Sequence, residues 1–289
     1  MANHANIYSV PRASFFDLPA TAGAEPYRIF LSIPAGTPPA EGWPLLVLTD
    51  GNATFPFAAA CLATQAPYPA ATNTGWGVVV AIGYPIDEAY DGMRRSWDLS
   101  PPPGKSYPPF TTDGRPVRTG GAEGFLTFIQ NVLLPWIQEK VPVNNGRKTL
   151  FGHSFGGLFT LYSLFERPGL FDNWIAASPA IYWEEAVILQ NERRRRNVPD
   201  GAAFLHLSAG EYEGDELAPF QQKNEDADTR MEHKKETRTV LLAREMAQRL
   251  ESGPDGLRAR FELYAGETHM SVLAVAVSRA VGIAFAIRA

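Results

Sequence analysis

The chain has 289 residues, of which 45% are apolar and 20% charged, and its formal net charge at pH 7 is −5. This composition excludes a disordered chain, and the weak negative charge argues against a nucleic-acid partner, which needs a concentrated basic face. No uncharged apolar stretch reaches the ~18 residues needed to span a bilayer. The first 16 residues also lack the basic and apolar parts of a secretory signal. We therefore expect no membrane partner and a cytoplasmic location.

Short apolar runs alternate with amphipathic segments along the chain. The nearly all-apolar run at residues 76–84 is typical of a strand covered on both faces. Further strands are predicted at residues 27–33, 44–51, 148–152, 173–179, 202–210 and 257–264, and helices at residues 55–65, 122–141, 154–167, 230–252 and 269–287. This alternation predicts an α/β fold, a mainly parallel sheet with helices on both faces, in a single domain over residues 1–289.

One long segment, residues 85–122, interrupts this alternation. It holds seven prolines and no periodic pattern, and it leaves the end of a predicted strand. Open α/β sheets bind ligands at that edge, and long loops inside compact domains are usually functional or disordered. We expect a proline-rich loop over the active site.

The hexapeptide GHSFGG at residues 152–157 is the strongest chemical signal in the chain. Its first five residues fit G-x-S-x-G, the nucleophile elbow, in which a serine occupies a strained turn between a strand and a helix. The simpler alternative is a tight turn without chemistry. The predicted strand before Ser154 and the predicted helix after it favour the nucleophile.

An acyl-transfer site also needs donors for the oxyanion that forms on the ester carbonyl. We expect one to be the backbone N–H of Phe155, directly after the nucleophile and at a helix N-terminus. The second is predicted to come from the turn after an earlier strand, where the sequence reads DGN, and we choose the Asn52 amide. By itself, DGN is better interpreted as a plain turn.

A serine hydroxyl needs a base, and the chain contains five histidines. His4 lies in the N-terminal tail, His206 inside a predicted strand and His233 in a charged helix. His153 neighbours the serine but points away from it at an elbow, so we expect it to line or brace the site. His269 follows a strand downstream of the serine, which is the chain order of α/β-hydrolases, and is the predicted base. The alternative for it is a capping or core histidine.

The acid that orients the base should lie between serine and histidine, after a strand. The segment LSAGEYEGDE supplies Glu211, Glu213, Asp215 and Glu216. A residue about three past the strand-ending glycine has turned back over the sheet edge, which favours Glu213, with Glu211 second. The chain contains no CxxC, HExxH or aspartate-rich calcium loop, and no GxGxxG opens a helix. We expect neither a metal nor another cofactor.

With these residues placed, the chain resembles the trilactone siderophore esterases of the α/β-hydrolase superfamily, which cleave enterobactin, salmochelin or bacillibactin. The matching stretches are LTDGNATF, AIGYP, RRSWDLSPP, GGAEGFLTFIQNVLLPWI, LFGHSFGGLF, SPAIYW, SAGEYE and ETHMSV. They occur in the family's order over roughly residues 45–275.

This resemblance implies an α/β-hydrolase fold and a serine esterase whose partner is a small-molecule ester, a ferric siderophore. It implies that Arg95, with Arg94 beside it, contacts the anionic iron catecholate, and that Trp183 lines the cleft. Arginine and aromatic surfaces suit such a flat, negative complex. The alternatives are a general carboxylesterase or thioesterase that acts on small acyl esters, and a non-catalytic binding protein on the same scaffold.

Overall fold

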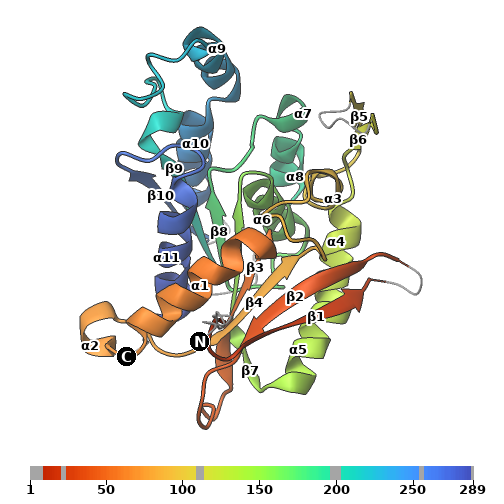
Figure 1. Ribbon diagram of the computed structural model, residues 1–289, viewed down its shortest axis with the longest axis vertical. Coiled ribbons are helices and arrows are strands. Elements are labelled where there is room, and N and C mark those ends of the chain that lie inside the picture. The colour runs from red at the N-terminus through yellow and green to blue at the C-terminus, as the bar shows by residue number, and fades with distance from the viewer. Residues whose placement is uncertain (1–8, 21–23, 109–113, 196–202, 254–256, 288–289) are drawn as a thin grey trace, which may run out of the picture.

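The computed structural model describes residues 9–20, 24–108, 114–195, 203–253 and 257–287. Its centre is an eight-stranded sheet in the order β1-β2-β4-β3-β7-β8-β9-β10 (Figure 1). The strands are β1 (Ala13–Pro19), β2 (Pro26–Ser32), β3 (Trp43–Leu48), β4 (Val78–Gly83), β7 (Val143–His153), β8 (Asn173–Ala177), β9 (Phe204–Gly210) and β10 (Arg258–Tyr264). The pairs from β4 to β10 are parallel, while β1, β2 and β4 pair antiparallel. The predicted fold class, a mainly parallel α/β sheet of the α/β-hydrolase type, is confirmed.

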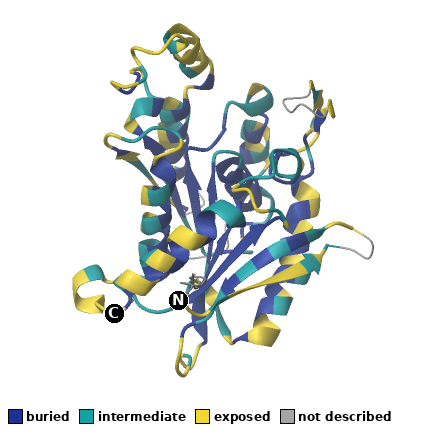
Figure 2. Ribbon diagram, viewed as in Figure 1, coloured by how far each residue is buried: buried dark blue, intermediate teal, exposed yellow. Residues whose placement is uncertain are grey.

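Helices cover both faces of the sheet, as the alternation of side chains along its strands requires. In β3, Leu45 and Val47 pack into one apolar cluster with α6 (Phe155–Glu166) and α10 (Thr239–Glu251). Leu46 and Leu48 point the opposite way, into a second cluster with α1 (Gly51–Gln65) and α11 (Val272–Ala284). Figure 2 shows the central strands of the sheet as buried between these layers, while the edge strand β1 is exposed. The central strands are apolar on every side chain because both of their faces are covered.

The carboxyl ends of the parallel strands lie at one edge of the sheet, and the candidate site is at that edge. Strand β7 ends at His153 and runs through Ser154 into α6. Strand β9 runs into a 3₁₀ turn at Glu211–Glu213, and β10 is followed by the turn that carries His269 into α11. Three segments far apart in sequence therefore meet beside one another.

The proline-rich segment 85–122 is more ordered than expected. It contains α3 (Gly92–Asp98) and a ribbon of β5 (Ser106–Tyr107) with β6 (Val117–Arg118). Asp91 caps α3 by accepting from the backbone N–H groups of Met93 and Arg94. The expectation of a loop was wrong for these parts. The Asp91 cap stabilises α3 and two residue pairs join β5 to β6, and neither feature produces a periodic apolar pattern in the sequence.

Two predicted helices are divided in the structure. The first becomes α4 (Ala122–Phe128), a π-helical turn (Ile129–Leu133) and α5 (Leu134–Lys140). Pro135 stands in the first turn of α5 and lacks an N–H, so the regular ladder cannot continue through it. The second, expected over 230–252, is α9 (Ala227–Thr237) followed by α10, because Arg238 adopts a left-handed conformation with φ 46°.

The remaining elements are short. They are α2 (Pro69–Thr72), α7 (Trp183–Ala186) and α8 (Ile188–Arg194). Strand β1 was not predicted, since it is an exposed edge strand with little alternation. In the described part of the chain, no helix is long and apolar enough to cross a bilayer. A single domain over residues 1–289 stays a prediction.

Candidate active site

The elbow conformation of Ser154 is imposed by close backbone packing. Ser154 has φ 58° and ψ −116°, a backbone conformation that residues other than glycine rarely adopt. A Cβ on Gly152 would lie 2.0 Å from the carbonyl oxygen of Gly156, and one on Gly156 would lie 2.3 Å from Thr49 Oγ1. Glycine is thus required on both sides of the serine. The turn presents the serine hydroxyl at the edge of the sheet.

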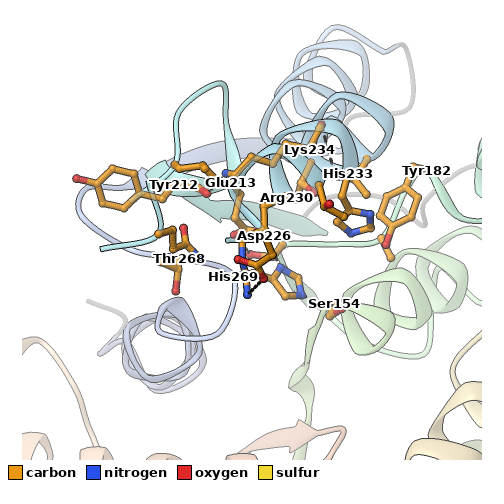
Figure 3. Close-up of a pocket in the computed structure, with 17 residues that line it drawn as sticks. Ser154, Tyr182, Tyr212, Glu213, Asp226, Arg230, His233, Lys234, Thr268 and His269 are labelled. Atoms are coloured by element: carbon orange, nitrogen blue, oxygen red, sulfur yellow. Dashed lines mark hydrogen bonds and ion pairs between the residues drawn. The ribbon is translucent and has the colours of Figure 1, made fainter. Parts of the chain in front are cut away.

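Ser154, His269 and Glu213 form a continuous chain of hydrogen bonds (Figure 3). Ser154 Oγ lies 3.1 Å from His269 Nε2, and His269 Nδ1 lies 2.6 Å from Glu213 Oε2. The histidine side chain is 43% exposed, whereas that of the glutamate is 5% exposed. The base therefore reaches solvent and substrate while the acid is shielded, which is the arrangement of a Ser-His-acid triad.

The protein holds Glu213 in its ionised form. Burial alone would raise the pKa of Glu213, but hydrogen bonds from His269, Ser178 and the Gly210 N–H outweigh it and lower the pKa. Ser178 Oγ donates to Glu213 Oε1 at 2.5 Å, and the Gly210 N–H donates to the same oxygen at 2.8 Å. Glu211 instead accepts from the Gly266 N–H at 2.7 Å on the exposed side. Between the two candidate acids, the geometry favours Glu213.

His153 braces the base from behind, and a contact between His153 and the substrate stays a prediction. Its ring is buried, with the centroid 4.7 Å from that of His269. Its Nε2 lies 2.8 Å from the His269 carbonyl oxygen, which can only accept, so this nitrogen carries the proton. Burial and the neighbouring His269 lower the pKa of His153 to about 3, so the ring is neutral. A neutral brace fixes the His269 backbone without placing a second charge beside the base.

The two predicted oxyanion donors differ in what the structure leaves available. Phe155 is the first residue of α6. The N–H groups in the first turn of a helix have no hydrogen-bond acceptor within that helix, so the Phe155 N–H can donate to an oxyanion. The Asn52 side chain is committed elsewhere: its Oδ1 accepts from the Tyr84 N–H, and its Nδ2 donates to the carbonyls of Tyr84 and Ile86. Asn52 can therefore contribute only its backbone N–H, in the first turn of α1. Both roles stay predictions.

Arg95 and Arg94 both bond to protein groups, and the substrate contact that the resemblance implied for them stays a prediction. Arg95 donates through Nε and Nη2 to the carboxylate of Asp50, at 2.8 and 3.0 Å. Its guanidinium lies 5.6 Å from the Phe155 ring centre. Arg94 turns to β2, where Nη1 donates to the Pro26 carbonyl at 2.8 Å. Each guanidinium is therefore engaged by protein groups.

Trp183 supports the site and does not line its main cavity. Its ring packs edge-on against Phe155, with centroids 4.6 Å apart, and lies 5.2 Å from Tyr107 of the β5–β6 ribbon. The preceding residue, Tyr182, takes the lining position instead. Sequence reasoning also missed Ser178 and Asp50, because no motif marks them and their roles depend on long-range contacts.

A cavity of about 440 Å³ opens beside the triad, within the size range of small-molecule sites. Its walls come from the triad loops, the 210–226 segment and α9. The described lining residues are Ser154, Ser178, Ala180, Tyr182, Tyr212, Glu213, Leu217, Gln221, Asp226, Thr229, Arg230, His233, Lys234, Thr237, Thr239, Thr268 and His269. Within the described ranges, no three His, Cys, Asp or Glu side chains are grouped to hold a metal ion. The site is built for acid–base chemistry on a ligand beside Ser154.

Known proteins are similar to this chain over most of its length. The model of the family described as "Putative esterase" matches residues 21–253. The chain is 34% identical over 283 residues to the ferri-bacillibactin esterase BesA of Bacillus subtilis, covering 95% of this chain and 90% of that protein. It is also 34% identical to the siderophore triacetylfusarinine C esterase of Aspergillus fumigatus, covering 93% of this chain and 92% of the relative.

A solved structure with a similar fold is the siderophore hydrolase EstB from Aspergillus nidulans. It superposes with a TM-score of 0.82 at 30% identity, and the match covers 99% of this chain and 98% of EstB. The similarity thus extends over the whole sheet and the segments that carry the triad.

Proposed function

This chain belongs to the esterase family, and we propose that it hydrolyses the ester bonds of a lactone-type siderophore through an acyl-enzyme intermediate. The observation that carries the proposal is the hydrogen-bonded Ser154, His269 and Glu213 chain at the wall of a cavity. Relatives similar over nearly the full chain carry the names of siderophore esterases. The proposal includes the release of iron, because opening the lactone unlinks the chelating arms and lowers their effective concentration around the metal.

In the first half of the reaction, Ser154 Oγ attacks the ester carbonyl carbon while His269 Nε2 takes the hydroxyl proton. Glu213 accepts from His269 Nδ1–H, fixes the tautomer and stabilises the imidazolium. General acid–base help of this kind typically contributes ~10²–10⁴-fold. The Phe155 N–H then stabilises the oxyanion, and each such donor is worth about 2.7–4 kcal/mol of the barrier.

In the second half, the tetrahedral intermediate collapses and the C–O bond to the leaving alcohol breaks. His269 returns the proton to that alcohol. Water, deprotonated by the same imidazole, attacks the acyl carbon and releases the carboxylic acid with Ser154 restored. The neutral His153 leaves His269 as the group that exchanges the proton in both halves.

We assign the iron-loaded form as the substrate. The name of the Bacillus subtilis relative specifies ferri-bacillibactin, and the α9 wall of the cavity at Ser154 carries polar and charged side chains. Iron is cargo of the substrate here. A cytoplasmic place of action, expected from the sequence, stays a prediction.

The proposal is tested by product analysis. Wild-type protein and Ser154→Ala are incubated with enterobactin, bacillibactin and a fusarinine-type ester, each with and without iron, and the products are read by liquid chromatography and mass spectrometry. We expect linear and monomeric products from at least one ferric trilactone, and none from the alanine variant. Hydrolysis of p-nitrophenyl butyrate without hydrolysis of any siderophore would make the chain a general carboxylesterase.

A further inference from the structure

Helix α9 turns a continuous polar stripe toward the catalytic cavity. Six described residues of α9 and its N-terminal boundary line the cavity, at positions 226, 229, 230, 233, 234 and 237. Their spacings of three and one residues place them on a single face of a helix. All six are polar or charged. Figure 3 shows Arg230 and Asp226 between α9 and His269 in that view, with His233 next to Tyr182.

Packing does not explain this stripe. A surface helix normally turns an apolar stripe inward, but in the described helix α9 only Thr237 is buried. The helix is held instead by Lys234, whose ammonium donates to the carbonyl oxygens of Tyr212, Gly214 and Glu216. These contacts join α9 to the loop that carries Glu213. The helix is thereby fixed over the cavity by one side chain of the stripe, which leaves the others for another role.

Arg230 is the cation of the stripe that a ligand can recruit. Its described ion partner is Asp226, with Arg230 Nη2 2.7 Å from Asp226 Oδ2. Both side chains are about half exposed, 45% and 50%, and exposed pairs of this kind are weak. A ligand anion can displace Asp226 at little cost. By contrast, Arg95 is 14% exposed and held bidentately by a buried carboxylate, so an exchange of partner there would leave a buried charge.

His233 adds a second hydrogen-bonding group on the same face. It lies one helical turn after Arg230, and its ring centroid is 6.4 Å from that of Tyr182, which also lines the cavity. The two rings lie at 85° to each other, so together they form one aromatic part of the cavity wall. Aromatic surfaces beside a guanidinium suit a planar, oxygen-rich anion.

We propose that the cavity-facing stripe of α9, with Arg230 and His233 at its centre, is the subsite that binds an anionic, oxygen-rich part of the ester substrate, such as a metal-bound catecholate arm. This deepens the proposed function and rests on it for the identity of the substrate. Arg230 donates in bidentate fashion to the anion, and the ester carbonyl is thereby placed at Ser154. The anion-binding role that the resemblance gave to Arg94 and Arg95 passes to α9.

The test uses a matched pair of chromogenic esters, the anionic mono-4-nitrophenyl glutarate and the neutral p-nitrophenyl butyrate, together with ferric enterobactin. Variants are Arg230→Ala and the control Lys235→Ala, which removes the same charge from an exposed position of α9 outside the described cavity lining. In Arg230→Ala we expect the ratio of kcat/KM for the anionic ester to that for the neutral ester to fall about tenfold, because a charge-assisted bond is lost. Most of the loss should appear as a higher KM.

The same variants are made in the Ser154→Ala background, and binding of ferric enterobactin is measured by titration calorimetry. A Kd at least tenfold weaker with Arg230→Ala and unchanged with Lys235→Ala supports the subsite. Equal effects of both variants, or none from either, overturn it. These readings do not depend on siderophore turnover, so a wild-type protein that hydrolyses no siderophore contradicts the proposed function while the ester ratio still decides the subsite.

Discussion

Arg95 and Asp50 form a buried, bidentate ion pair directly behind the candidate oxyanion loop. The side chains are 14% and 3% exposed, and the two N···O distances are 2.8 and 3.0 Å. Asp50 immediately precedes α1 in a left-handed conformation, φ 53°. The pair therefore ties α3 to the turn from β3 into α1, and it fixes the direction in which the first N–H groups of α1 point.

Loss of Arg95 should damage stability and activity without regard to substrate charge. Arg95→Met leaves the Asp50 carboxylate buried without its partner, so we expect a loss of about 3–5 kcal/mol in the free energy of unfolding. The values of kcat/KM for anionic and neutral esters should fall by the same factor. Urea unfolding and parallel kinetics measure both effects. The double variant Arg95→Met with Asp50→Asn should be more stable than Arg95→Met alone. A selective loss with anionic esters would instead restore Arg95 as a substrate contact.

The strain at Ser154 predicts an unusual order of stabilities. With φ 58° and ψ −116°, any residue with a Cβ is strained by about 1–3 kcal/mol, and glycine removes that strain. Glycine costs roughly 0.5–1 kcal/mol of backbone entropy elsewhere in a protein. Ser154→Gly should therefore be more stable than Ser154→Ala by about 1 kcal/mol in urea unfolding, and both should lack esterase activity. An alanine variant that is the more stable of the two would contradict an elbow strained in this way.

The acid of the triad can be separated from its neighbour by two isosteric changes. Glu213→Gln removes the carboxylate that accepts from His269 Nδ1, and we expect kcat to fall by about 10³–10⁴-fold, as for loss of a triad acid. Glu211→Gln disturbs only an exposed bond to the Gly266 N–H and should change kcat severalfold at most. Small, equal losses would show that the enzyme works with a Ser-His pair.

His153 makes the protein sensitive to acid. Its folded-state pKa of about 3 lies below the ordinary 6.5, so between these values the unfolded chain binds more protons than the folded one. The stabilisation is complete above about pH 6.5 and is lost as the pH falls toward 3, at most about 1.4 kcal/mol per pH unit for one proton. In His153→Gln, whose amide can still donate to the His269 carbonyl, unfolding free energies measured from pH 7.5 to 5 should decline less steeply. Parallel curves for both proteins would rule out His153 as a source of the acid sensitivity.

The sequence predicted what depends on short, local patterns. The elbow around Ser154 was recognisable because glycines are needed within two residues of the serine, and His269 and Glu213 followed from their places after strands. The partners of Arg95 and Arg94 were not predictable, because Asp50 and Pro26 are brought to them by the fold, 45 and 68 residues away in sequence.

The role of α9 escaped prediction for a different reason. The sequence predicts one long helix over residues 230–252, because no glycine or proline separates the charged residues of α9 from the amphipathic pattern of α10. The helix is interrupted at Arg238, which has a left-handed backbone conformation that arginine seldom adopts. No glycine, asparagine or proline at this position indicates the interruption in the sequence. With the chain bent there, the residues of the polar stripe line the cavity while most of them stay exposed to solvent.

Ser154 is proposed to perform the hydrolysis of a siderophore ester, and titration with a fluorophosphonate examines this role at the residue itself. The protein is labelled in graded amounts, the modified residue is located by peptide mass spectrometry, and ferric trilactone hydrolysis is measured on each sample. We expect one label per chain, on Ser154, and siderophore hydrolysis that falls in direct proportion to the labelled fraction. Fully labelled protein that still opens the trilactone, or a label on another residue that abolishes activity, would contradict it.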